Sequence, residues 1–133
     1  MLTQGKPLAW IGNSKKDLIA LPIGARKFFS HALDFAQRGV QHDAAKVLKG
    51  FGGAGVLEVV EDDIGGTYRA VYTVKFEEAM FVLHCFKKKS KHGISTPKDD
   101  MDIIRARLKV AAALVKELRD GTALGKEREQ TRH

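Results

Sequence analysis

A run of lysines directly follows an apolar segment in the second half of the chain. Residues 80–86 are almost wholly apolar, and Lys87, Lys88, Lys89 and Lys91 come immediately after them. Four ammonium groups this close repel one another, so the run is stable when water solvates it or a polyanion binds it. The pattern indicates a nucleic-acid-binding surface at the end of a strand. The alternative is a solvated run that protects an edge strand from aggregation.

The spacing of the lysines divides them between the two sides of an extended chain. Lys87 and Lys89 share one side, about 6.6 Å apart, and Lys88 points to the other. Two ammonium groups on one side could follow successive phosphates, and a lysine crowded by cations can act as a base. We therefore take Lys87 and Lys89 as catalytic candidates and Lys88 and Lys91 as RNA-binding candidates, without deciding which lysine does chemistry.

Arg69 is a charged residue within an otherwise apolar strand, YRAVY. A guanidinium can hold two phosphate oxygens and stays charged, which suits stabilisation of the crowded phosphate in metal-free RNA cleavage. The alternative is a structural arginine paired with Glu58 or Glu61 on the neighbouring strand, and composition alone slightly favours that pair. As a surface arginine, Arg69 should be removable at little cost to the fold.

Three further residues complete the candidate RNA site. His92 lies in the turn after the lysines, Lys49 lies in a glycine-rich loop, and the ring of Tyr72 could stack on a base. For Lys49 a solvated loop is an equal alternative, and Tyr72 or Tyr68 could instead pack beneath the last helix. No spacing among the histidines, Cys85 and the acids matches a metal-ligand motif, so we expect no metal site and no cofactor.

Periodicity and turn residues predict the elements that position these side chains. We expect strands at 8–11, 56–61, 67–76 and 80–87, and helices at 15–20, 22–38 and from 96 to about 120. Ser14 is the expected N-cap of the first helix, and Thr96 followed by Pro97 opens the last one. Residues 40–55 contain four glycines, which predicts a segment without regular secondary structure.

This order of elements predicts one α+β domain at residues 1–121 and a flexible polar tail at 122–133. The expected sheet is small and antiparallel, made of the N-terminal strand and a three-stranded meander. An N-terminal helical pair and a C-terminal helix pack on it. We expect the helices on one face, which leaves the other face open for a ligand.

Composition limits the classes of function. The chain has 133 residues, a net charge of +7 and a pI of about 9.6, which favours nucleic acid or an acidic protein as partner. Its single cysteine forbids an internal disulfide and suits a reducing cytoplasm. We recognise neither a signal peptide nor an apolar run of membrane-spanning length. The expected location is therefore the cytoplasm.

The order of several fragments resembles the RelE/ParE toxin superfamily, and most closely its phage-derived branch with HigB-like toxins. The fragments are the strand YRAVY at 68–72, the run FKKKSK at 86–91, and Thr96-Pro97 opening a helix. The segment AKVLKGFGGAGVLEV at 45–59 also looks like that branch. The resemblance extends from Leu8 to Leu118 and implies a RelE-like fold.

This resemblance implies a toxin of a type II toxin–antitoxin system. Its expected activity is metal-independent, ribosome-dependent cleavage of messenger RNA, which inhibits translation, and its expected partner is a helix-turn-helix antitoxin. An arginine at position 69 would then be a nuclease residue, which reverses the preference for a structural pair. The alternatives are a ParE-like inhibitor of DNA gyrase without nuclease activity and a non-enzymatic basic nucleic-acid-binding domain.

Overall fold

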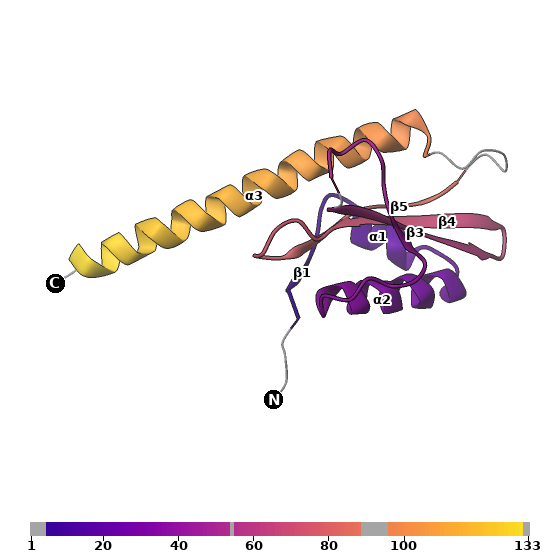
Figure 1. The fold of residues 1–133 in the computed structure, drawn as a ribbon, viewed down its shortest axis with the longest axis horizontal. Coiled ribbons are helices and arrows are strands. Elements are labelled where there is room, and N and C mark those ends of the chain that lie inside the picture. The colour runs from indigo at the N-terminus through magenta and orange to yellow at the C-terminus, as the bar shows by residue number, and fades with distance from the viewer. Residues whose placement is uncertain (1–4, 54, 89–95, 132–133) are drawn as a thin grey trace.

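The computed structural model describes residues 5–53, 55–88 and 96–131, with side chains described as far as residue 121. Five strands and three helices occur in these residues (Figure 1). In chain order they are β1 Leu8–Trp10, α1 Ser14–Ile19, α2 Ile23–Gln37, β2 Ala45–Val47, β3 Val56–Asp63, β4 Gly66–Thr73, β5 Met80–Lys87 and α3 Lys98–Thr131. The predicted α+β class is confirmed.

The strands form one mixed sheet in the order β1-β5-β4-β3-β2. Strands β2 to β5 are antiparallel neighbours, whereas β1 lies parallel to β5, with Leu8 opposite Met80. The expectation of a purely antiparallel sheet was therefore wrong, because α1, α2 and the meander intervene between β1 and β5. Strand β2 was also missed, since the glycines that follow it conceal three residues of pairing with β3.

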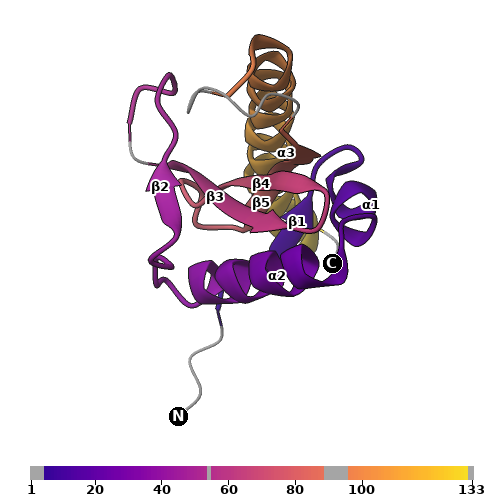
Figure 2. The ribbon, with the colours of Figure 1, turned by 90° about the vertical axis from the view of Figure 1, so that its right-hand side faces the viewer.

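Helices cover both faces of the sheet, which corrects the prediction of one open face. In Figures 1 and 2, α1 and α2 lie on one side and α3 on the other. Each side has its own apolar core: Phe29 and Leu33 of α2 belong to one, and Ile104 and Val115 of α3 to the other. The amphipathic stripe of α3 was recognised correctly, but a stripe does not specify which face it covers. We refer below to the α2 face and the α3 face.

The helix ends differ in detail from those expected. Ser14 is the first residue of α1 rather than its cap, and its buried hydroxyl donates to the Val82 carbonyl at 3.0 Å. Helix α3 continues to Thr131, past the predicted end near Gly121. One glycine costs a helix about 1 kcal/mol, which the good helix formers on either side offset. The predicted flexibility of residues 122–133 stays a prediction.

Candidate functional site

The candidate site lies where β4 begins, β5 ends and α3 begins. Lys87 is the last residue of β5 and is exposed, and the N–H of the half-buried Lys88 donates to the Thr67 carbonyl at 2.8 Å. The ladder between β4 and β5 thus continues one residue past the strand, which holds both backbones firmly. The other three candidates of this run, Lys89, Lys91 and His92, lie outside the described residues.

Strand pairing separates the catalytic candidates between the two faces. Lys87 is directly opposite Tyr68, which belongs to the core under α2, so Lys87 is on the α2 face. Arg69 is opposite Phe86, which belongs to the core under α3. Because side chains alternate along a strand, Lys88 falls on the same face as Arg69. The structure therefore groups Arg69 with Lys88 and does not bring it together with Lys87.

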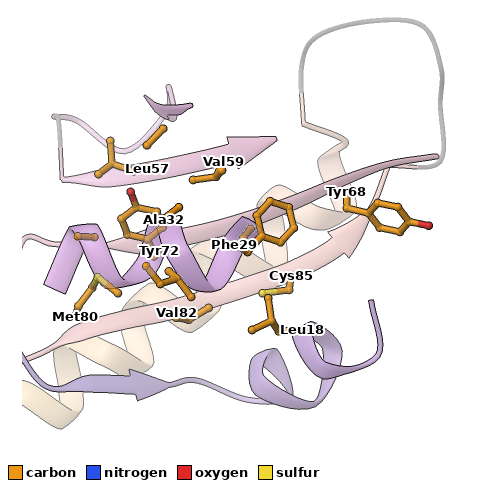
Figure 3. Close-up of a cluster of buried hydrophobic side chains, with 14 of the residues drawn as sticks. Leu18, Phe29, Ala32, Leu57, Val59, Tyr68, Tyr72, Met80, Val82 and Cys85 are labelled. Carbon is orange, nitrogen blue, oxygen red and sulfur yellow. The ribbon is translucent and has the colours of Figure 1, made fainter. Parts of the chain in front are cut away.

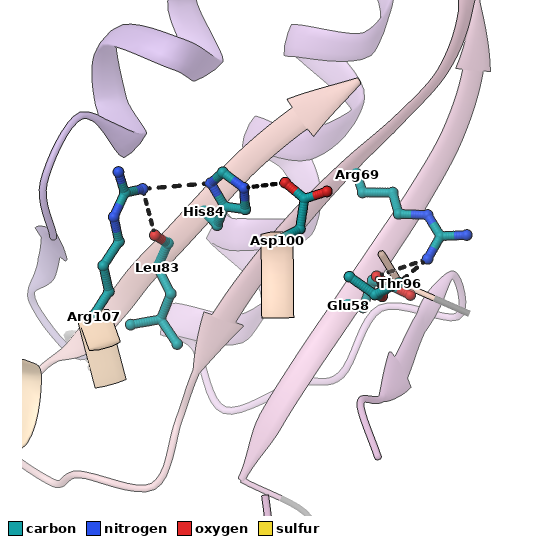
Figure 4. A network of polar contacts seen from close by, with 7 residues as sticks. All are labelled: Glu58, Arg69, Leu83, His84, Thr96, Asp100 and Arg107. Atoms are coloured by element: carbon teal, nitrogen blue, oxygen red, sulfur yellow. Dashed lines mark hydrogen bonds and ion pairs between the residues drawn. The ribbon is translucent and has the colours of Figure 1, made fainter. Parts of the chain in front are cut away.

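The side chain of Arg69 is held in a closed triangle with one acid and one hydroxyl (Figure 4). Its Nη1 donates to Glu58 Oε2 at 3.0 Å and to Thr96 Oγ1 at 3.1 Å, and Thr96 Oγ1 donates to the same carboxylate oxygen at 2.8 Å. The three residues come from β4, from β3 and from the segment that precedes α3. The triangle therefore fixes the entry of α3 onto the sheet.

Arg69 is not the surface residue that the sequence suggested. It is 4% exposed, and the Glu58 side chain paired with it is 12% exposed. Arg69 forms the ion pair with Glu58 that was considered as the alternative to a role in catalysis. Removal of one partner of a buried ion pair leaves the other charge without compensation. The expectation that Arg69 can be removed at little cost was therefore wrong.

A second polar cluster ties α3 to β5. His84 Nε2 lies 2.8 Å from Asp100 Oδ1, while Arg107 Nη1 donates to the Leu83 carbonyl at 2.9 Å and lies 3.4 Å from His84 Nδ1 (Figure 4). The Phe86 ring stacks on the imidazole at 4.5 Å. We call His84, Asp100 and Arg107 the histidine clamp. It holds the first turns of α3 against the sheet.

A β-bulge explains why His84 faces α3. Val71 pairs with His84 but Tyr72 pairs with Val82, so Leu83 is an extra residue on β5. Leu83 and His84 therefore both lie on the α3 face. Arg107 also packs on the turn before α1, because a Cβ at Gly12 would lie 2.8 Å from Arg107 Nε. Gly12 has a φ of +59°, so this turn favours glycine for conformational reasons as well.

The partners of His84 define its protonation state. Arg107 is a donor, so Nδ1 accepts and Nε2–H donates to Asp100, which corresponds to the neutral imidazole. Burial lowers the pKa of His84, while the hydrogen bond and the charge of Asp100 partly oppose that shift. His84 is therefore a hydrogen-bonded histidine of the sheet, and its 6% exposure leaves the ring little access to solvent.

The glycine-rich loop adds cations to the α3 face. Lys49 is exposed. Its neighbour Gly50 approaches α3 closely, because a Cβ added at Gly50 would lie 3.6 Å from the guanidinium nitrogen Nη2 of Arg105. The guanidinium of Arg105 lies over the Phe51 ring at 5.7 Å. The loop with Lys49 therefore lies beside Arg105 near the start of α3, where Arg105 Nη1 is 3.6 Å from Asp102 Oδ1. Arg105 was not among the predicted site residues, although its outward position on the helix was readable.

Tyr72 does not lie on an RNA-accessible surface. It is 0% exposed and packs in the core under α2, not under the last helix (Figure 3). Tyr72 and Tyr68 share the α2 face, but a base cannot stack on a ring that is wholly enclosed. We therefore withdraw Tyr72 as an RNA contact.

Sequence reasoning missed the contacts of Thr96 and Asp100, whereas Glu58 was considered as a partner of Arg69. Thr96 bonds to Glu58, 38 residues away along the chain, and Asp100 bonds to His84, 16 residues away. No local pattern marks contacts of that separation.

Comparison with known proteins identifies the family. Residues 16–109 match the family described as phage-derived protein Gp49-like, a match that spans most of the chain. The chain therefore belongs to this family of RelE/HigB-like toxins, as the sequence resemblance indicated. A search of curated proteins gave no match.

One similar solved structure is the free E. coli toxin RelE, in a variant with two arginines replaced by alanine. It is 16% identical, with a TM-score of 0.49, and the match covers 79% of this chain and 96% of RelE. Within the described residues, no helix is long and apolar enough to cross a membrane. The same residues contain no group of three histidine, cysteine or acidic side chains that could hold a metal ion.

Proposed function

We propose that the chain is the toxin of a type II toxin–antitoxin system and that it cleaves messenger RNA on the ribosome. The observation that carries this proposal is the basic end of the sheet in a member of a toxin family. Lys87 and Lys88 are held at the end of β5, with Lys87 on the α2 face and Lys88 on the α3 face. Cations on a rigid scaffold suit a polyanionic substrate.

The chemistry proposed for this site uses cationic side chains and no metal. One lysine in its neutral form would take the 2′-OH proton as the 2′-oxygen attacks phosphorus. Charged lysines at the end of β5 would stabilise the crowded phosphate, and one of them would give a proton to the departing 5′-oxygen. Lys87, Lys88 and Lys89 are the candidates. Arg69 would act through position: its triangle with Glu58 and Thr96 would align the start of β4 and the end of β5 beneath the lysines.

The proposed partners follow from the family and from charge. Messenger RNA on the ribosome would be the substrate. A helix-turn-helix antitoxin would neutralise the toxin, and acidic side chains on it would suit a chain of net charge +7. The proposed place of action is the cytoplasm.

Controlled expression in a bacterium tests the proposal. We expect induction to stop growth and translation, with new 5′ ends in messenger RNA only where ribosomes are engaged. Lys87→Ala and Lys88→Ala should each lower the slope of log affinity against log salt for RNA by about 1. The matched control is Lys27→Ala, an exposed lysine on α2, which should change neither toxicity nor binding.

The burial of Arg69 against Glu58 favours one second candidate, a binding toxin that inhibits DNA gyrase and lacks nuclease activity. An arginine already neutralised by a carboxylate is a weaker phosphate ligand than a free one. Intact transcripts together with trapped gyrase–DNA breaks after induction would support this candidate and contradict the nuclease proposal.

A further inference from the structure

A pocket of about 280 Å³ lies on the α2 face, away from the candidate RNA site. It opens where the chain leaves α2 and is bounded by the inner sides of β3 and β4. Its apolar walls are Ala36, Val40, Leu57 and Val74. The volume is close to the lower end of the range for small-molecule sites.

The floor of this pocket includes a buried hydroxyl without a partner. Tyr72 is 0% exposed, and its Oη finds no hydrogen-bond partner among the described residues. Tyr72 pairs across the strands with Leu57, a second lining residue, and Figure 3 shows the hydroxyl end beside it. Tyr68, on the same face, differs: its hydroxyl donates to the Ile64 carbonyl at 2.7 Å.

Because Tyr72 is buried, its hydroxyl stays protonated and can donate a hydrogen bond. Burial raises the pKa of Tyr72 to about 12, so the phenol keeps its proton at every physiological pH. Buried polar groups in proteins are nearly always hydrogen-bonded, and an exception calls for an explanation. A ligand atom that accepts a hydrogen bond would supply the missing partner.

Lys6 brings a positive charge to the same pocket. Its Nζ donates to the carbonyls of Val74 at 3.0 Å and Phe76 at 2.9 Å, which accounts for two of its three N–H groups. The backbone of Lys6 is tied to Gln37 at the end of α2 by two further hydrogen bonds. The ammonium is therefore held in place, with one N–H left for a ligand within the described residues.

The charges around the pocket favour an anion. The lining residues include one cation, Lys6, and no acid. The end of α2 is the negative end of a helix dipole, but its last carbonyls are occupied: Gly39 N–H donates to Ala36 and Lys6 N–H to Gln37. Because Tyr72 Oη is enclosed in this structure, a ligand would reach it by displacing the exposed rim residues Gly39 and Val40.

We propose that this pocket binds a small organic monoanion, a carboxylate on an apolar body, with the carboxylate held by Tyr72 Oη and Lys6 Nζ. The apolar body would lie against Leu57, Val74 and Ala36. This site is separate from the proposed RNA site. It lies on the other face of the sheet from Arg69 and Lys88, and Lys87, on the same face, pairs with Tyr68, four residues before Tyr72 on β4.

Titration of the isotope-labelled full chain with benzoate, followed by NMR, tests the proposal. We expect saturable shifts of the amides of residues 39–41 and 74. Benzamide, the neutral isostere, should bind about tenfold more weakly, because it lacks the charge that Lys6 attracts. Tyr72→Phe removes only the hydroxyl and should weaken benzoate binding about fivefold.

Tyr68→Phe is the matched control, because it removes a hydroxyl on the same strand and face that does not line the pocket. It should leave benzoate binding unchanged. Thermal unfolding of each variant confirms that it is folded before titration. Absence of saturable shifts in the wild-type chain overturns the proposal. Equal binding of benzoate and benzamide, or of benzoate by wild type and Tyr72→Phe, overturns it as well.

Discussion

Two polar clusters attach the start of α3 to the sheet, and they differ in the kind of charge they use. The triangle of Arg69, Glu58 and Thr96 is built around an arginine, which is charged at every accessible pH. The histidine clamp is built around His84, which is neutral in the folded chain and can gain a proton. Both lie on the α3 face and both are largely buried.

The two clusters hold the same helix by different physical means. A buried arginine–carboxylate pair orients the helix independently of pH, but removal of either partner leaves the other charge buried and unpaired. A buried neutral imidazole avoids the cost of a buried charge and becomes unfavourable on acidification. We therefore expect the triangle to dominate stability and the clamp to dominate its dependence on pH.

The largest effect should come from Arg69→Ala. Loss of the guanidinium leaves Glu58 buried and unpaired, so the free energy of unfolding should fall by about 3–5 kcal/mol in urea denaturation. The matched control is Arg38→Ala, which breaks an exposed pair with Asp34 and should cost less than about 1 kcal/mol. Similar values for the two variants would contradict the dominance of the triangle.

A double replacement sharpens that result. Arg69→Met combined with Glu58→Leu removes both charges and keeps the volume, so it should recover most of the stability lost in Arg69→Ala. If toxicity stays absent in this stable variant, Arg69 acts in the site itself. If toxicity returns, Arg69 acts only through the fold.

A smaller loss is expected from Asp100→Ala. This change leaves His84 Nε2–H buried without an acceptor and should cost about 1–3 kcal/mol in the same measurement. Asp99→Ala is the control, because Asp99 is exposed in the same first turn and shares only the helix-dipole effect. Equal losses of stability in the two variants would mean that Asp100 stabilises the fold through the helix dipole and not through the histidine clamp.

Thr96→Val should have a still smaller effect, about 1 kcal/mol. It removes one hydroxyl but keeps the ion pair between Arg69 and Glu58, whose atoms lie 3.0 Å apart. Hydrogen exchange in the first turns of α3 should increase more than exchange in β4. A loss as large as that of Arg69→Ala would show that the hydroxyl, not the ion pair, holds the triangle together.

The smallest effect is a pH dependence. The folded-state pKa of His84 is lowered by burial, so the neutral form stabilises the fold above pH 6.5, the ordinary value. That stability is lost as pH falls through the lowered pKa. Asp100, Arg107 and Asp17 are the charged groups that act on the imidazole. His84→Gln should flatten the acid side of the stability profile, whereas His31→Gln, at an exposed position, should not.

The elements with strong local patterns were predictable from the sequence. Strand β5 matches its predicted bounds, 80–87, because a continuous apolar run ends abruptly at a lysine. Helix α2 differs by one residue at each end, because its apolar stripe and Pro22 define it. The parallel pairing of β1 and the second face covered by α3 depend on contacts between distant segments, which no local pattern encodes.

The site was predictable only in part for the same reason. The pair between Arg69 and Glu58 was foreseen as an alternative, because opposite charges on neighbouring strands attract. The separation of Arg69 from Lys87 required the register of β4 against β5. The bulge at Leu83 places both Leu83 and His84 on the α3 face, whereas alternation from Met80 and Val82 would have placed His84 on the α2 face.

The length of α3 turns its attachment into a lever. About 45 Å of helix separate Asp100 from Thr131 at 1.5 Å per residue, and Figure 1 shows the far end well beyond the sheet. An exposed bridge between Arg119 and Glu78 is a second support along the way. A tilt of about 10° at the histidine clamp would move the free tip by about 8 Å. Any change in the tilt of α3 at the histidine clamp would therefore be largest at the far end of the helix.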